Sequence, residues 1–478
     1  MLFESKVPEL IRATIAETRN DILFEENLLR NKLKNFYENI QSTPEYLGNY
    51  GFLNDDKQWI IPPHTTNITK DIIDEVSLIY KRPPQRKIVM QKSKSQKTTE
   101  EDNYTLWWQQ RYRIQYGLKV AERYKKLLHN ILFRVIYKKE NKVWDYFIET
   151  DFDPHFTEDD PIHPFAYSLR LRRNTRETNR EKVKEKEIWI FWSDEEVFYH
   201  DNDGKIEQLP NLPDYKNPFG IMPFIEMYEN IPIDEYKFLG AKDLVETNQS
   251  ININLMNLNM MIHYQAFDQP YTSGVPESKA KEIKVGPNKI INLLDSEARM
   301  ALLGFQPKIE SVIKAIEFEM GFISHTYKIN FDWKIQGTPA SGFSLIVRNI
   351  RLMEARQDDI DECIMQEKQL YKVIAKMQSF YKSQNEIDAR EPKLNPEDDI
   401  SVNFTEIDFP VNVDEDLKRR DWNIKNNVET PIDYIKKRDP DLSDDEALIV
   451  YQNNKKLNGN LSRRDLFKTA LTKGNKNE

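Results

Sequence analysis

One segment of the chain has the glycine spacing of a phosphate-binding loop. In Gly337-Thr-Pro-Ala-Ser-Gly342 the two glycines are separated by four residues and precede a predicted helix. A phosphate-binding loop needs a lysine after the second glycine to reach the β- and γ-phosphates, but Phe343 occupies that position. Pro339 also removes a backbone N–H that would otherwise bind phosphate. We therefore interpret this segment as a flexible loop that leads into a helix.

A second group of residues is acidic and lies within a predicted long helix. Asp358, Asp361 and Glu362 share one helical face, and Asp359 is adjacent to them. Paired carboxylates could hold magnesium for a nuclease. No histidine or lysine within the cluster completes such a site. We expect instead a solvated or intersubunit acidic face.

The histidines and the cysteine form no recognisable reactive motif. The seven histidines are scattered, and none belongs to a short metal-binding motif. The single cysteine, Cys363, lies among apolar residues of the long helix, so we expect it in the core. The chain also contains no Gly-x-Ser-x-Gly elbow and no dinucleotide fingerprint. From the sequence we expect no enzyme, and we predict no catalytic residue, metal or cofactor.

The first half of the chain is predicted to combine helices with an antiparallel sheet. Helices are expected in residues 7–40, after the N-cap residue Asn67, and in residues 104–129. From Asn130 the runs ILFRVIYKK and VWDYFIET suggest a hairpin, and FAYSLRLRR, EIWIFW and EVFYH are further strand candidates. The pattern predicts a meander of about five strands in an α+β domain.

The second half is predicted to be mainly helical. A helix over residues 236–263 is followed by short β-type runs, broken by Pro and Gly, in residues 264–306. A second helix over residues 308–329 leads through a loop to a very long helix from Phe343 to Tyr381. The remainder contains a strand, ISVNFTEIDF, and short helices, one of which begins at the N-cap Thr430 before Pro431.

Composition limits the kinds of partner that the chain could bind. The net charge is −9, whereas tight general binding of a DNA backbone requires a basic surface. No apolar run approaches the roughly 20 residues of a membrane span, and the first residues lack the apolar region of a signal peptide. The longest uncharged run, Thr247 to Phe267, is rich in Asn and Gln. We expect a folded protein that does not enter a membrane.

The order of these elements resembles that of the portal proteins of tailed bacteriophages. Asn217-Pro-Phe-Gly-Ile-Met-Pro-Phe-Ile225 resembles the segment Asn-x-x-Gly-x-x-Pro-hydrophobic that precedes the family's first stem helix, and residues 237–249 resemble the start of that helix. Ser341-Gly342-Phe343-Ser344-Leu345 resembles the entry to the long helix. Residues 427–430 and 444–446 resemble the C-terminal helical segment. The resemblance covers roughly residues 50–460, but the stem is unusually rich in Asn and the C-terminal segment is short.

The resemblance implies an α+β, elongated subunit with the parts of a portal protein. These parts are a helix-plus-antiparallel-sheet wing, a two-helix stem, a small β-rich clip, a tunnel loop, a long wing helix and a short helical crown. The implied boundaries are wing 1–235, first stem helix 236–263, clip 264–306, second stem helix 307–330, tunnel loop 331–342, long wing helix and returning strand 343–425, and crown 426–478.

The resemblance also implies a function and a set of partners. A portal protein forms a homo-oligomeric ring, as a dodecamer, at one capsid vertex and acts as a head-tail connector. The terminase large subunit docks on it during viral DNA packaging, and head-completion adaptor or tail proteins replace the motor before genome ejection. It also contacts the major capsid or scaffold protein, and double-stranded DNA passes through it without sequence readout. We would then expect it in the virion, and in the host cytoplasm during assembly.

Two sets of residues would line the DNA channel if the resemblance holds. The tunnel loop would form the constriction with Phe331, Asp332, Trp333, Lys334, Gln336, Gly337 and Ser341. Its one cation, Lys334, would either face DNA or point to solvent or pair with Asp332. In the stem, Asn248, Asn252 and Asn259 would form a neutral channel wall or an intersubunit face.

Ile251, Leu255, Leu258 and Ile262 would pack against neighbouring subunits. Two alternatives to a portal protein remain at this point. One is a helical scaffold or adaptor protein of a virion, and the other is a magnesium-dependent nuclease.

Overall fold

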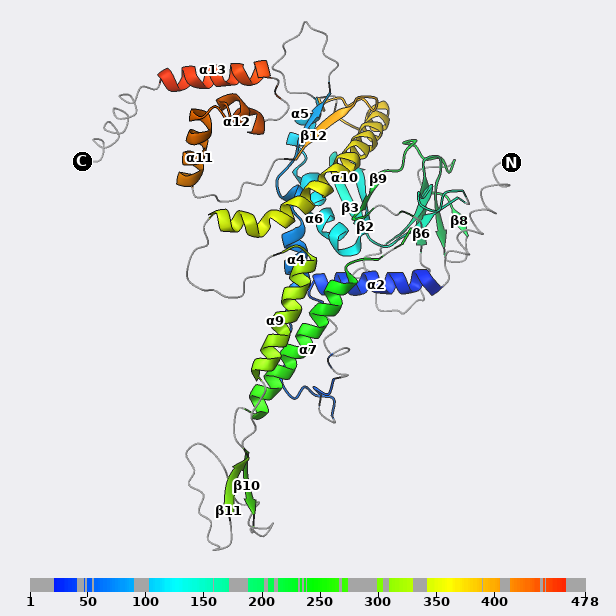
Figure 1. Cartoon of the computed structure of the whole chain (residues 1–478). Helices are drawn as coiled ribbons and strands as arrows, with labels where there is room; N and C mark the ends of the chain where they lie inside the picture. The colour runs from blue at the N-terminus through cyan, green and yellow to red at the C-terminus, as the bar shows by residue number, and fades with distance from the viewer. Residues whose placement is uncertain are drawn as a thin grey trace, which may run out of the picture. The chain divides into compact units, whose positions relative to one another are not determined.

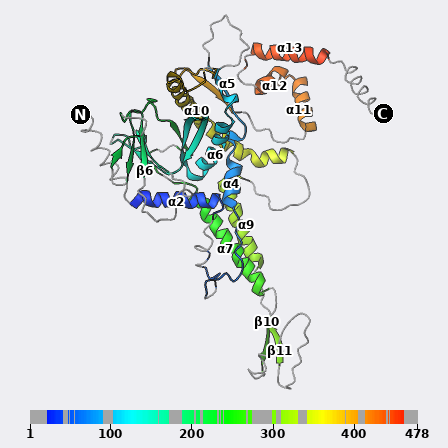
Figure 2. The same ribbon diagram turned by 180° about the vertical axis from the view of Figure 1, so that it is seen from behind.

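The computed structural model describes most, but not all, of the chain (Figures 1 and 2). The described residues are 21–40, 47, 50–53, 56–89, 103–157, 159–171, 188–201, 205–209, 214–230, 233, 236–237, 239–265, 269–273, 299–303, 309–329, 342–388, 390–404, 413–438, 442 and 444–460. They fold as a mixture of helices and antiparallel sheets, which confirms the α+β class at this coarse level. Two compact units are present, one of residues 1–334 with 351–404 and one of residues 335–350 with 405–478.

The N-terminal helices of the first unit are α2 (Asp21–Tyr37), α4 (Ile68–Val76), α5 (Asn103–Gln109) and α6 (Tyr112–Leu128), with a short 3₁₀ helix at Ile79–Lys81. Asn67 caps α4 as predicted, because its side chain accepts a hydrogen bond from the Lys70 N–H at 3.0 Å.

The prediction of one helix over residues 104–129 is wrong, because α5 and α6 are separate. Arg111, between them, has a non-helical backbone, and its guanidinium lies 3.0 Å from Glu391 and over the ring of Trp107.

The strands of the first unit form two main sheets, which corrects the predicted single meander. One sheet has the order β3-β2-β9, from β2 (Asn130–Lys138), β3 (Val143–Glu149) and β9 (Phe224–Tyr228). The other has the order β4-β5-β6-β7-β8, from β4 (Phe152–His155), β5 (Ala166–Arg170), β6 (Ile188–Ser193), β7 (Val197–Asp201) and β8 (Ile206–Glu207).

The chain changes sheets at Thr150 and Asp151. There Arg30 of α2 donates to the Thr150 carbonyl at 2.8 Å and Lys34 pairs with Asp151 at 2.7 Å. The contacts that separate the two sheets therefore come from a helix more than 100 residues earlier in the chain.

Two antiparallel helices, α7 (Lys242–Gln265) and α9 (Ile309–Thr326), lie side by side (Figure 1). Their register is fixed at two levels, where Tyr327 donates to Asp243 at 3.0 Å and Ser250 donates to Glu319 at 2.9 Å. Between them in the chain, β10 (Gln269–Ser273) pairs antiparallel with β11 (Arg299–Leu303). We refer to α7 and α9 as the stem hairpin.

The longest helix is α10 (Gly342–Ser383), whose C-terminal half lies in the core of the first unit. After it, β12 (Ile400–Asn403) pairs antiparallel with β1 (Gln85–Ile88). Arg86 of β1 forms a bidentate ion pair with Glu367 of α10, with N–O distances of 2.8 and 2.6 Å.

The second unit contains α11 (Val413–Lys425), α12 (Pro431–Arg438) and α13 (Asp444–Asn460). Thr430 caps α12 as predicted. Its hydroxyl accepts from the Asp433 N–H at 3.2 Å, and the Asp433 carboxylate accepts from the Thr430 N–H at 2.7 Å.

Candidate functional site

All of the predicted tunnel loop except Gly342 lies outside the residues that the structure describes. Phe331, Asp332, Trp333, Lys334, Gln336, Gly337 and Ser341 all lie outside them. The described chain ends at Ile329 after α9 and begins again with Gly342 at the start of α10, so these residues connect the stem hairpin to the long helix. Their role in a DNA channel stays a prediction.

Asn248 and Asn252 of α7 are completely buried within the subunit, so the prediction that they form a channel or intersubunit face is wrong. The Asn248 side-chain oxygen accepts from the N–H and the hydroxyl of Thr69, at 2.9 and 3.1 Å. The Asn252 oxygen accepts in the same way from Thr66, at 2.8 and 3.2 Å. These two amides attach α7 to the start of α4. Asn259 is half-buried, and its role stays a prediction.

The apolar stripe on α7 is divided between the subunit's own core and its surface. Ile251 is buried in the main hydrophobic core and Leu255 packs against that core. Leu258 is half-buried and Ile262 is exposed. Only the end of the stripe towards the β10–β11 pair is therefore free to contact a partner.

Two of the four clustered acidic residues of α10 pair with lysines of α6, whereas Asp358 and Asp361 are exposed. Asp359 accepts from Lys126 at 2.8 Å, and Glu362 accepts from the buried Lys125 at 3.2 Å. Burial opposes the charge of Lys126, but the carboxylates of Glu229 and Asp359 outweigh burial and raise the pKa of this lysine. This arrangement joins α6 to α10 and uses carboxylates that a metal site would need. In the described part of the chain no group of three His, Cys, Asp or Glu side chains is placed to hold a metal ion.

A second buried acidic group was not predicted from the sequence. Glu226 of β9 accepts hydrogen bonds from the hydroxyls of Tyr167, Tyr228 and Tyr236. Burial raises the pKa of Glu226 to about 7, although the three hydroxyls and nearby Arg30 act in the opposite direction. The only sequence signal for this group is a glutamate within the otherwise apolar and aromatic run Phe224-Ile-Glu-Met-Tyr228. Its tyrosine partners could not be inferred, because two of them lie on other segments.

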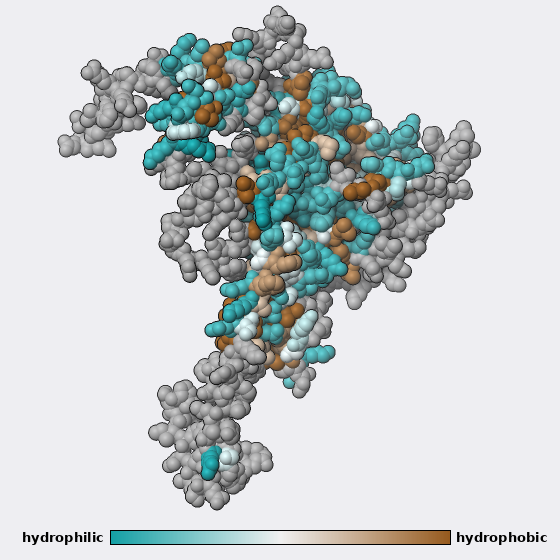
Figure 3. All heavy atoms as spheres, viewed as in Figure 1, coloured by the Kyte–Doolittle hydropathy of each residue, from teal (hydrophilic) through white to brown (hydrophobic). Residues whose placement is uncertain are grey.

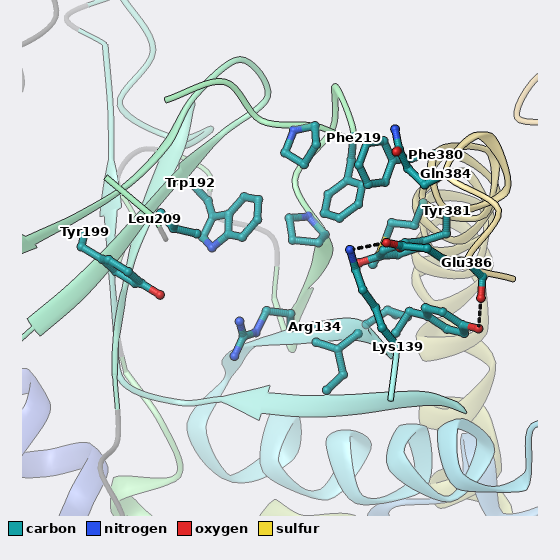
Figure 4. Close-up of a pocket in the computed structure, with 16 residues that line it drawn as sticks. Arg134, Lys139, Trp192, Tyr199, Leu209, Phe219, Phe380, Tyr381, Gln384 and Glu386 are labelled. Atoms are coloured by element: carbon teal, nitrogen blue, oxygen red, sulfur yellow. Dashed lines mark hydrogen bonds and ion pairs between the residues drawn. The ribbon is translucent and has the colours of Figure 1, made fainter. Parts of the chain in front are cut away.

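A pocket of about 650 Å³ lies between β2, the second sheet and the C-terminal end of α10 (Figure 4). Aromatic and aliphatic residues make up most of its wall, among them Trp192, Phe219 and Tyr381. Its two cations are paired, Arg134 with Glu149 at 2.6 Å and Lys139 with Glu386 at 2.6 Å. Such a wall suits an apolar group.

Comparison of the sequence with models of protein families and with curated proteins finds no match. Among the described residues, no helix is long and apolar enough to cross a membrane. The functional interpretation therefore depends on the order of the elements and on their contacts.

Proposed function

We propose that this chain is the portal protein of a tailed bacteriophage. The observation that supports this proposal most is the order of the elements before, within and after the stem hairpin. An α+β body leads into α7, a β10–β11 pair follows, α9 returns antiparallel to α7, and the long α10 comes next. This order is the one implied by the resemblance for wing, stem, clip, second stem helix and long wing helix.

The contacts at the base of the stem hairpin support a role in transmitting force. Leu244, Val245 and Ile251 of α7 and Met320 and Ile323 of α9 all belong to the main core of the first unit. Asn248 and Asn252 add six hydrogen bonds to Thr66 and Thr69, four accepted by their side-chain oxygens and two donated to the Thr66 carbonyl. A stem fixed in this way transmits force between the wing and the clip.

In this proposal the subunits form a closed ring, a dodecamer, through which double-stranded DNA enters and leaves the capsid. The terminase motor docks on the clip during packaging, and adaptor or tail proteins replace it afterwards. DNA must pass without adhering, so dense phosphate contacts would be harmful. The net charge of −9 agrees with that requirement.

The test is the assembly state of the purified full-length protein. We expect negative-stain images to show closed rings with a central channel, and native mass spectrometry to give one large oligomer. Monomers, dimers or rods under all assembly conditions would contradict the proposal and favour a scaffold or adaptor protein. Degradation of DNA by the protein in the presence of magnesium would instead favour the nuclease.

A further inference from the structure

The stem hairpin exposes a pair of phenylalanines on α9. Phe318 is 73 % exposed and Phe322, one helical turn later, is 66 % exposed. Ser311, Ala315 and His325 extend this line with alternating spacings of four and three residues, and none of the five residues is Asp, Glu, Lys or Arg. At the body end of the line, the His325 ring lies 2.9 Å from the Arg351 guanidinium. This spacing is typical of a helix that packs along another helix. We call these five residues the Phe seam.

The Phe seam faces away from α7. The contact with α7 is made by Glu319, which accepts from Ser250, and the neighbouring Met320 and Ile323 are buried. At about 100° per residue, Phe318 and Phe322 lie more than a quarter-turn from the centre of that side. The seam is therefore not covered by the helix with which α9 pairs.

A second apolar surface lies on a different side of the stem hairpin. Ile262 of α7 is 46 % exposed and Ile313 of α9 is 41 % exposed. Ile262 continues the line of Ile251 and Leu255, and Ile313 lies two turns before the buried Met320. Both residues thus extend, towards the β10–β11 pair, the sides of α7 and α9 that are buried nearer the body. We call this surface the Ile patch.

Hydrophobic side chains are also visible at the surface of the stem hairpin in Figure 3. Clustered exposed apolar groups mark contact surfaces in soluble proteins. An uncharged surface suits these two phenylalanines, because it gives up little hydration when it covers them. The stem hairpin itself offers one, since α7 has no Asp, Glu, Lys or Arg from Thr247 to Gln265.

We propose that the Phe seam of one copy packs against the Ile patch of the next copy of this chain. Two different faces on one subunit make a heterologous contact, and repetition of such a contact closes a ring when the rotation permits. This inference rests on the proposed function and names the surfaces that join the subunits. It also explains why a hairpin attached to its own core carries two uncovered apolar faces.

The test uses two full-length variants that each remove one face. Phe318→Glu/Phe322→Glu loses the Phe seam but keeps the Ile patch, and Ile262→Glu/Ile313→Glu does the reverse. Native mass spectrometry should find each variant monomeric at concentrations at least tenfold above those at which the wild type forms rings. Mixed in equal amounts, the two variants should form a one-to-one complex that does not grow, because only one intact contact remains.

The matched control is Tyr112→Glu/Tyr116→Glu, an aromatic pair of the same spacing on α6 that is 78 % and 61 % exposed. This variant should still form rings. Loss of rings in the control would contradict the assignment of the contact to the stem. Circular dichroism checks folding, and Phe318→Ser/Phe322→Ser replaces the charged variant if the latter does not fold.

The failures of the two proposals can be told apart. If the wild type forms rings and the Phe-seam variant does too, this inference is wrong and the portal proposal stands. If the Ile-patch variant alone forms stable dimers, the Phe seams pair with each other and the heterologous contact is wrong. If the folded variants do not associate when mixed, the two faces do not form one contact. A wild type that never forms rings contradicts the portal proposal itself.

Discussion

Arg86 and Glu367 form a deeply buried ion pair. Both side chains are almost inaccessible to solvent, and the guanidinium also lies 3.6 Å from the centre of the Trp108 ring and donates to Gln115 at 2.8 Å. The pair joins β1 to α10. A pair of this kind specifies how two elements meet, whereas its net contribution to stability is small because both ions lose hydration.

Removal of one partner of this ion pair should destabilise the folded chain. We expect Arg86→Met to lower the free energy of unfolding by about 3–5 kcal/mol, because Glu367 would stay buried without a counter-ion. The double variant Arg86→Met/Glu367→Leu should recover most of that loss. Urea denaturation measures both. Lys205→Ala, which breaks an exposed pair with Glu207, is the control and should cost less than about 1 kcal/mol. A double variant as unstable as the single one would contradict this explanation.

Glu226 should make the stability of the subunit depend on pH. Its pKa of about 7 in the folded chain exceeds the ordinary value of 4.5, so the folded state binds the proton more tightly. The contribution to stability is therefore present below about pH 4.5 and is lost as the pH rises to about 7, with a total of about 3 kcal/mol. Glu226→Gln should flatten the profile between pH 5 and 8 in chemical denaturation. An unchanged slope in this variant would show that other groups cause it.

At the residue scale, the sequence predicted local hydrogen bonds better than distant ones. The N-caps Asn67 and Thr430 were predictable, because a cap and its partner lie three residues apart. Asn248 and Asn252 were assigned to the wrong surroundings, because their partners lie about 180 residues away. Their helical spacing placed them together, but it did not show what covers them.

At the scale of elements, α7 is attached to α4 by side-chain amides. We expect Asn248→Ala and Asn252→Ala each to lower the free energy of unfolding by about 1–3 kcal/mol, since Thr69 or Thr66 would lose buried acceptors. Hydrogen exchange of the Thr66 and Thr69 amides should become faster. Asn259→Ala is the control and should change the stability by less than about 0.5 kcal/mol. Unaltered exchange at these threonines would rule out the anchoring role.

Most of the helices and strands were predictable from their periodicity, but their assembly was not. The hairpin β2–β3, the strands β5 to β7 and the long α10 correspond to predicted segments. Arg30 and Lys34 bind the chain at the junction of the two sheets, and Glu391 binds Arg111 at the break between α5 and α6. These partners lie far from the segments that they shape, so patterns within a segment do not reveal them.

At the scale of the whole molecule, the connection between α9 and α10 is the predicted DNA constriction. In a ring, identical loops would converge on the axis, and Lys334 would repeat as a girdle of positive charge that salt screens. We expect deletion of residues 332–340 to leave rings intact and to weaken retention of packaged DNA, measured by nuclease protection of filled capsids. Failure of ring assembly, or full retention of DNA in intact rings, would contradict this role.

The burial of Cys363, the one cysteine of the sequence, has a practical consequence for labelling the protein. It lies on α10, and burial raises the pKa of its thiol. Maleimide dyes react with accessible thiolates, so the natural chain should stay unlabelled. A cysteine placed at an exposed position, such as Lys205, would then carry the sole fluorophore of each subunit. If the proposed ring forms, single-molecule energy transfer between such dyes would report movements of its subunits.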